Sequence, residues 1–140
     1  MYGVNDVFDY ESDLRNPRKG GIEGALLDPK YHRITLILAF GIAAPFAVVL
    51  STVNPSATFW LWLTLFAVVA YSLRGLRFKE IPFLDSLTSS LHFVGPMLVG
   101  LAMAQAKIES SHLIAIAAFL IWGMASHAFG AVQDVRCAWP

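Results

Sequence analysis

The stretch ITLILAFGIAAPFAVVLSTV, residues 34–53, indicates the fold class more directly than any other part of this sequence. It contains no Asp, Glu, Lys or Arg. A helix of this length spans about 30 Å, which is the thickness of the hydrocarbon core of a bilayer. The stretch therefore predicts a membrane-spanning helix.

Three further uncharged runs follow, at residues 57–73, 86–106 and 111–133. The chain is 56% hydrophobic and only 14% charged, with a mean hydropathy of +0.59, which is unusual for a soluble domain. We therefore predict an all-α, multi-span transmembrane helix bundle. Residues 1–140 form a single membrane domain in this interpretation, and residues 1–33 form a polar segment and cytoplasmic loop before the first span.

The distribution of positive charge predicts the orientation in the membrane. Nine of the ten basic residues lie before the first span, after the second or after the fourth. They are Arg15, Arg18, Lys19, Lys30, Arg33, Arg74, Arg77, Lys79 and Arg136. By the positive-inside rule these segments face the cytoplasm, and the linkers 54–56 and 107–110 face the other side. Residues 5–13, the loop 74–85 and Asp134 are then expected on one cytoplasmic face.

The polar segment 5–13, NDVFDYESD, concentrates acidic side chains before the first span. In a continuous helix, Asp9 lies about 60° from Asp6, and Asp13 lies within about 20° of Asp6, so the three carboxylates share a face. Such oxygen ligands suit Mg²⁺, which commonly completes its coordination with phosphate oxygens of a substrate. A solvated acidic helix start is the alternative, since acids there favour the helix dipole.

The loop after the second span supplies positive charge. Arg77 offers a planar fork and Lys79 a mobile ammonium group, and both can bind diphosphate oxygens. Charges that only fix the topology are the alternative interpretation. The acidic segment, this basic loop and Asp134 are together expected on one face, and Mg²⁺ bound to a diphosphate is the simplest ligand that uses all three.

Several functional classes are disfavoured. The formal net charge is zero, and no basic run alternates with aromatic residues, so nucleic acid is not an expected partner. The single cysteine, Cys137, cannot form an internal disulfide. The sequence contains neither a phosphate-binding loop motif nor a nucleophile-elbow motif, and it begins without a secretory leader.

Taken in order, these motifs resemble the UbiA superfamily of intramembrane prenyltransferases. The resemblance rests on Asn5-Asp6-x-x-Asp9-x-x-x-Asp13, on Tyr71-Ser72-x-x-x-x-Arg77-x-Lys79 two spans later, and on Asp134 after two more. The segments NPRKGG, 16–21, and RFKEIPFLDS, 77–86, are most similar to the lycopene elongase branch, which adds five-carbon units to carotenoid ends. The resemblance covers nearly the whole chain but only about half of the nine-span family fold.

The resemblance also implies roles for individual residues. Asp6, Asp9, Asp13 and Asp134 would hold Mg²⁺, while Asn5, Arg77, Lys79 and Phe78 would bind substrate. Asp6, Asp9, Asp13, Tyr71, Arg77 and Lys79 would form the catalytic set. The implied donor is an allylic diphosphate such as dimethylallyl diphosphate. The implied acceptor is lipophilic, such as lycopene, and the protein would work as an integral protein of the cell membrane with its site facing the cytoplasm.

The sequence departs from the family pattern at several points. Arg74 and Gly75 stand where prolines are common, and Ala138 stands where a second acid of the last motif is expected. A truncated or frame-shifted reading frame is one explanation of the two ends, and the 140-residue chain is then expected to be an inactive fragment. Other functions remain open at this stage: an aromatic-acceptor prenyltransferase of quinone synthesis, a small transporter or a non-catalytic membrane subunit.

Polar residues inside the spans receive simpler interpretations. His92 and His127 are ionisable residues within apolar runs, which makes them functional hypotheses by default. A neutral histidine that hydrogen-bonds a neighbouring helix is the favoured interpretation for both. Ser89, Ser90 and Gly95 are expected to allow close helix packing rather than to take part in catalysis.

Overall fold

The computed structural model describes residues 2–16, 19–21, 24–73 and 75–137. Within these residues, eight helical elements follow one another: α1 (Tyr2–Phe8), α2 (Tyr10–Asp13), η1 (Pro29–Tyr31), α3 (His32–Leu50), α4 (Pro55–Ser72), η2 (Phe78–Glu80), α5 (Pro82–Met103) and α6 (Ser110–Cys137). The only pairing of β type in the described residues is one isolated bridge, between Gly21 and Gly24. The all-α prediction is confirmed.

In the described part of the chain, four helices are long and apolar enough to cross a membrane, as predicted. Their boundaries differ by a few residues from the uncharged runs because local chemistry sets the helix ends. Proline occupies the first position of both α4 and α5, where the missing N–H costs no hydrogen bond. α5 therefore begins at Pro82, and Asp85 lies in its first turn, where a carboxylate favours the helix dipole.

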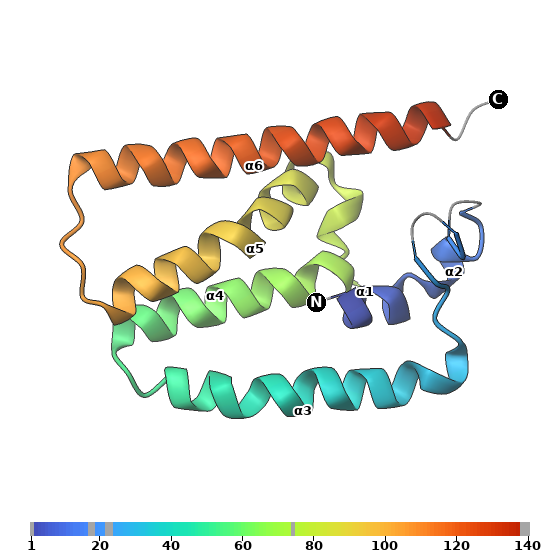
Figure 1. Ribbon diagram of the computed structural model, residues 1–140, viewed down its shortest axis with the longest axis horizontal. Coiled ribbons are helices and arrows are strands. Elements are labelled where there is room, and N and C mark those ends of the chain that lie inside the picture. The colour runs from blue at the N-terminus through green and yellow to red at the C-terminus, as the bar shows by residue number, and fades with distance from the viewer. Residues whose placement is uncertain (1, 17–18, 22–23, 74, 138–140) are drawn as a thin grey trace.

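α5 packs between α4 and α6, and these two interfaces hold the bundle together (Figure 1). Small side chains allow the close approach: a Cβ added at Gly95 would collide with Thr64 of α4, and one added at Gly123 of α6 would collide with Ser90. The Ser90 hydroxyl also donates to the Leu120 carbonyl of α6, at 2.8 Å. The packing roles predicted for Ser90 and Gly95 are confirmed.

Large apolar side chains cover the outside of the bundle. Examples are Ile42 and Phe46 on α3, Phe59 on α4, Phe93 on α5 and Ile114 on α6, each at least 60% exposed. In water this surface would be costly, whereas lipid tails solvate it without a penalty. This exposed apolar surface and the four apolar helices together show that the chain is an integral membrane protein.

The polar segments meet at one end of the bundle. α1 contacts both α3 and α4, and η2 contacts the end of α4 and the start of α5. In Figure 1, α1, α2 and the C-terminal end of α6 all lie toward the right of the view. The predicted convergence of the acidic segment with the loop after the second span is thus found. That this end faces the cytoplasm stays a prediction.

Candidate functional site: an ion-paired acidic motif at one end of the bundle

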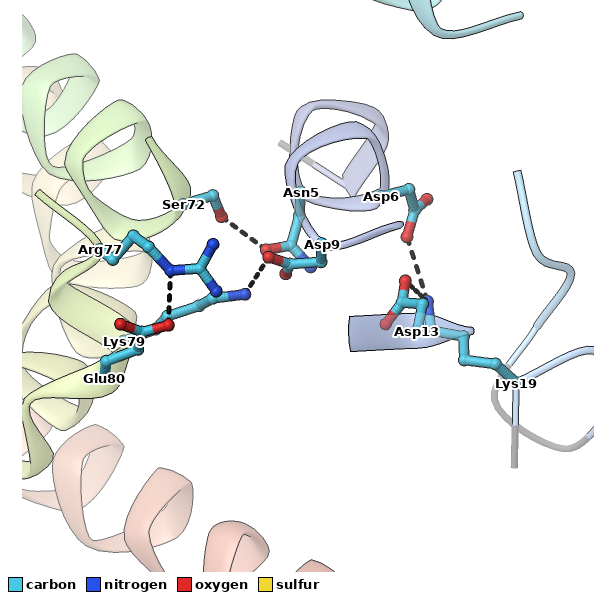
Figure 2. Close-up of polar contacts among 9 residues, drawn as sticks. All are labelled: Asn5, Asp6, Asp9, Asp13, Lys19, Ser72, Arg77, Lys79 and Glu80. Carbon is cyan, nitrogen blue, oxygen red and sulfur yellow. Dashed lines mark hydrogen bonds and ion pairs between the residues drawn. The ribbon is translucent and has the colours of Figure 1, made fainter. Parts of the chain in front are cut away.

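Asp9 and Lys79 join the acidic segment to the basic loop. The Lys79 ammonium forms an ion pair with Asp9 Oδ1, and only 6% of the Asp9 side chain and 16% of the Lys79 side chain are exposed. Figure 2 shows Lys79 reaching from the loop toward Asp9. Two charges with so little exposure are stable only as a pair, so the contact fixes the loop against the acidic segment.

A hydrogen bond beside this ion pair fixes the same two segments. The Ser72 hydroxyl, at the end of α4, donates to Asn5 Oδ1 of α1 at 2.6 Å. Ser72 is 2% exposed. Asn5 and Asp9 lie four residues apart and face the same side of the acidic segment, so Asn5 reaches the end of α4 and Asp9 reaches the loop that follows it (Figure 2).

Asp6 and Asp13 face away from Lys79 and share a different cation. The Lys19 ammonium lies 3.1 Å from Asp6 Oδ1 and 3.0 Å from Asp13 Oδ2. Burial lowers the pKa of Lys19, but the hydrogen bonds and charges of Asp13 and Asp6 outweigh it, so the pKa is raised above its ordinary value of 10.5. The stabilisation from this bridge is thus fully present below pH 10.5 and is lost as pH rises through the higher folded-state value.

The three carboxylates therefore do not form the single cluster that a continuous helix predicts. The chain bends at Asp9, between α1 and α2, and the two lysines draw the carboxylates to opposite sides. Across residues 2–16, 19–21, 24–73 and 75–137, no group of three or more His, Cys, Asp or Glu side chains is close enough to hold one metal ion. The predicted single face of three carboxylates is corrected to one ion pair, Asp9 with Lys79, and one group of three, Lys19 with Asp6 and Asp13. Metal binding by the three carboxylates stays a prediction.

Arg77 lies in the loop, and Figure 2 shows its side chain extending on the side of Asn5 and Asp9, while its ion pair is with Glu80. Its Nε donates to Glu80 Oε1 at 2.5 Å, and its backbone is left-handed, with φ 41°. Gly75 has φ 101°, a conformation that proline cannot adopt because its ring fixes φ near −65°. The glycine in place of a family proline thus belongs to a different loop conformation. Arg74 lies outside the described residues.

The two aromatic site candidates pack in different places. Phe78 meets Phe66 of α4 edge-on, with ring centroids 6.3 Å apart, which favours a role in anchoring η2. Tyr71 meets His92 of α5 edge-on at 5.7 Å. It also lines a pocket of about 440 Å³ between α4, α5, α6 and η2, together with Lys79, Asp85, Ser126, His127, Gly130 and Ala131. Tyr71 is therefore the aromatic candidate that adjoins the ion-paired loop.

The last motif is only partly within the described residues. The backbone of Asp134 belongs to α6, one turn beyond Gly130 of the pocket. Its side chain lies outside the described part of the structure, and so does Ala138. The predicted role of Asp134 in metal binding therefore stays a prediction.

The donor groups present suit a hard divalent cation. The Lys19 ammonium marks a position where one cation already contacts the carboxylates of Asp6 and Asp13. Asp9 Oδ1 is buried and, among the described residues, has a cationic partner but no aligned hydrogen bond. Carboxylate oxygens in this state are the ligands that Mg²⁺ binds, with its remaining coordination left to water and phosphate.

Comparison with known proteins identifies the family to which this chain belongs. The UbiA prenyltransferase family model matches residues 1–137. The chain belongs to this family. It is 56% identical over 137 residues to a C(50) beta-cyclic carotenoids biosynthesis protein of Dietzia sp., covering 97% of this chain and 32% of that protein. It is 53% identical over 138 residues to a lycopene elongase/hydratase of Corynebacterium glutamicum, covering 97% and 48%.

More distant relatives of the UbiA family show the same partial coverage. A lycopene elongase/hydratase of Halobacterium salinarum is 35% identical over 145 residues, with 97% of this chain and 47% of that protein covered. The chain thus spans about half the length of the curated relatives it matches, or less. No solved structure gives a significant match. Members of the family generally depend on a divalent metal.

Four residues of this site were missed as site residues by the sequence argument. In the sequence, Lys19 contributes to the charge asymmetry and to the resemblance, and Ser72 contributes to the resemblance alone. Asp85 and His127 lie on different helices, and nothing in their spacing predicts that they meet at 3.0 Å. Their shared signal was that both are ionisable residues close to or inside apolar runs.

Proposed function

We propose that this chain forms the diphosphate-binding part of a Mg²⁺-dependent prenyltransferase that moves an allylic group to a lipophilic acceptor. The observation that carries the proposal is the ion pair between Asp9 and Lys79. It joins a carboxylate suited to the metal with an ammonium suited to the diphosphate, from segments two spans apart. Membership of the UbiA family supports the same reaction class.

In the structure, lysine side chains neutralise most of the negative charge of the acidic segment. Lys19 and Lys79 together balance most of the charge of Asp6, Asp9 and Asp13. When a metal–diphosphate complex arrives, Lys79 can leave Asp9 for the phosphate oxygens, and Arg77 can leave the exposed carboxylate of Glu80. Metal alone would displace Lys79 from Asp9 and leave its ammonium group without an anionic partner, whereas a diphosphate supplies one, so the metal is expected to bind only together with a diphosphate.

Each side chain then has a defined task during transfer. Bound Mg²⁺ would supply Lewis-acid charge that neutralises the diphosphate leaving group. Lys79 and Arg77 hold that leaving group as the C–O bond breaks, and Asn5, fixed by Ser72, orients the start of the acidic segment. Tyr71 presents an aromatic ring beside the allylic cation, a contact that contributes roughly 0.5–2 kcal/mol. The apolar bundle limits access of water to the cation.

The donor and the acceptor are proposed from the relatives. The names of the Corynebacterium and Halobacterium proteins, lycopene elongase/hydratase, favour lycopene or a similar long polyene as acceptor. Dimethylallyl diphosphate is the corresponding donor for the addition of a five-carbon unit. The competing acceptor class is an aromatic acid of quinone synthesis.

Binding can be tested on the 140-residue chain in lipid nanodiscs. Isothermal titration calorimetry with Mg²⁺ alone should give no measurable heat of binding, whereas Mg²⁺ with dimethylallyl thiolodiphosphate, a slowly ionising analogue, should saturate. Asp9→Asn should abolish that binding, and Asp28→Asn, which removes an exposed carboxylate outside the site, should not. Equal binding by Asp9→Asn and the unchanged chain would contradict the proposal.

Turnover can be tested in a chimera, since the relatives extend beyond the matched segment. The chain replaces the matched half of the Corynebacterium glutamicum protein, and membranes are incubated with Mg²⁺, dimethylallyl diphosphate and lycopene. Asp6→Asn and Asp9→Asn are each expected to reduce turnover by about 10²-fold or more. Near wild-type rates in both would overturn the site assignment. Prenylation of hydroxybenzoate with lycopene left unchanged would assign the aromatic-acceptor class instead.

A further inference from the structure

A second polar cluster lies inside the helical part of the bundle, next to the ion-paired loop. Tyr71 of α4, Asp85 of α5 and His127 of α6 line the pocket of about 440 Å³, and Lys79 lines it too. Tyr71 and Asp85 also interact electrostatically. Metal and diphosphate binding, as proposed above, makes no use of Asp85 or His127.

Asp85 and His127 form a close pair across α5 and α6. His127 Nε2 lies 3.0 Å from Asp85 Oδ1, and the two side chains are 26% and 17% exposed. Within the described part of the chain, that oxygen has no hydrogen-bond partner of good geometry, and neither ring nitrogen of the neighbouring His92 has one. Such groups are costly among apolar helices, so a purely structural origin for this cluster is disfavoured.

The chemistry of the pair follows from which atoms face each other. A carboxylate oxygen at 3.0 Å favours a proton on His127 Nε2, because two lone pairs would repel at that distance. The basic lone pair of the ring is then on Nδ1. A histidine oriented by a carboxylate in this way accepts a proton readily, since the carboxylate stabilises the imidazolium that forms.

Lys79 connects this pair to the leaving group. The same side chain pairs with Asp9 and lines the pocket of Asp85 and His127. A diphosphate held by Lys79 therefore releases its allylic cation at the edge of this pocket. The acceptor double bond that attacks there is converted into a second cation, which needs a nearby proton acceptor to finish the reaction.

We propose that His127, positioned by Asp85, removes the proton that ends prenyl transfer; this inference rests on the proposed function. The allylic C–O bond breaks and its electron pair leaves with the diphosphate. The π pair of the acceptor forms the new C–C bond and leaves a carbocation on the acceptor. A C–H bond beside that carbon then breaks, its electrons form a new C=C bond, and the proton moves to His127 Nδ1.

The product ratio of the chimera tests this step. If no proton acceptor is present, the final cation persists until water adds to it, so His127→Asn should shift the products from alkene toward tertiary alcohol by about tenfold. Release of the first diphosphate should change little. The control is His112→Asn, an exposed histidine at the other end of α6, whose alkene-to-alcohol ratio should equal that of the unchanged protein.

Asp85 acts through His127 and needs a separate readout. Asp85→Asn should give the same shift toward alcohol, and Asp85→Glu should restore part of the alkene. In the 140-residue chain, nitrogen-15 histidine spectra should show His127 neutral with its proton on Nε2, and Asp85→Asn should remove that preference. This second measurement needs no turnover, so it separates failure of the inference from failure of the proposed function.

Two results would overturn the inference. One is a chimera in which His127→Asn turns over with an unchanged ratio of alkene to alcohol. The other is a spectrum in which His127 of the unchanged chain carries its proton on Nδ1 or is doubly protonated at neutral pH. By contrast, an unmodified chimera that makes no prenylated product, with a His127 spectrum as expected, would refute the proposed function.

Discussion

The two ends of the bundle satisfy their polar groups in different ways. At the end that joins α3 to α4, neutral hydrogen bonds predominate: Asn54 caps α4 by accepting from the Ala57 N–H at 2.8 Å and donates to the Ala102 carbonyl at 3.0 Å. At the other end, charged side chains from α1, α2 and the two loops pair with one another, as in Asp9 with Lys79. Neutral hydrogen bonds therefore cap the helices at the first end, whereas charged side chains cluster at the second end.

This difference indicates where function lies. Backbone caps are the least costly way to end a helix, because they satisfy groups that are already present. Ion pairs with little exposure require both partners to lose water and often contribute little net stability. We propose that this end binds a ligand that exchanges with these pairs, with the metal taking the place of the lysine ammonium groups at the carboxylates.

Labelling from the two sides of the membrane gives the largest expected contrast. With Cys137 replaced by serine, Ser56→Cys and Ser110→Cys should react completely with an impermeant maleimide added outside cells. Ser12→Cys, at the site end, should react only in inverted vesicles. All three positions are exposed, and Ser12 avoids the strain that a cysteine would meet at Gly75 with φ 101°. The reverse pattern would place the site on the outer face.

Removing the loop cation should have the next largest effect. Lys79→Gln in the chimera is expected to lower kcat/KM by about 10²–10³-fold, because the leaving group loses its nearest positive charge. It also leaves Asp9 buried without a partner, which costs about 3–5 kcal/mol of stability. Rates and thermal unfolding of purified protein measure the two effects separately.

Two further variants separate the functional effect of Lys79 from the structural one. Lys79→Gln combined with Asp9→Asn should recover much of the lost stability, since no unpaired charge remains, yet should stay inactive. Lys107→Gln, which removes an exposed lysine near the opposite end, should leave both properties unchanged. Recovery of activity in the double variant would mean that the pair only supports the fold.

A smaller effect is expected at the other lysine of the site. Lys19→Gln removes the ammonium that lies between Asp6 and Asp13, so metal no longer competes with it. In the presence of the diphosphate analogue, the affinity for Mn²⁺, used as a spectroscopic probe in place of Mg²⁺, should rise about fivefold, equivalent to roughly 1 kcal/mol. Lys30→Gln, which breaks the exposed pair with Asp28, is the matched control. A lower affinity in Lys19→Gln would show that this lysine supports the metal site.

Much of the fold was predictable because each span is a long run without charge. Those runs fix the order and alternation of the helices, and alternation alone brings the acidic segment and the loop after α4 to one end. The uncharged run begins at residue 86, after Asp85, whereas α5 begins at Pro82. The helix includes Asp85 because a carboxylate in the first turn interacts favourably with the helix dipole.

The details of the site depended on tertiary partners and were not predictable from spacing. A continuous helix predicts one face for all three carboxylates, but Asp9 pairs with Lys79, whereas Asp6 and Asp13 pair with Lys19. The spacing of these residues does not predict which lysine each carboxylate meets. His127 was interpreted as a neutral histidine bonded to another helix. The structure supplies a partner on α5, and the partner is a carboxylate.

The smallest predicted effect tests the neutral end. Asn54→Ala removes the cap of α4 and the bond to Ala102, and should cost about 1–2 kcal/mol of unfolding free energy. Asn54→Asp keeps the capping oxygen and loses only the donor, so it should cost about half as much. Asn54 and Ser72 lie a helix length of about 27 Å apart, so neither change should alter the affinity for Mg²⁺ with the diphosphate analogue. A weaker affinity at unchanged stability would show that the two ends are coupled through α4, and the division between a closing end and a binding end would then be wrong.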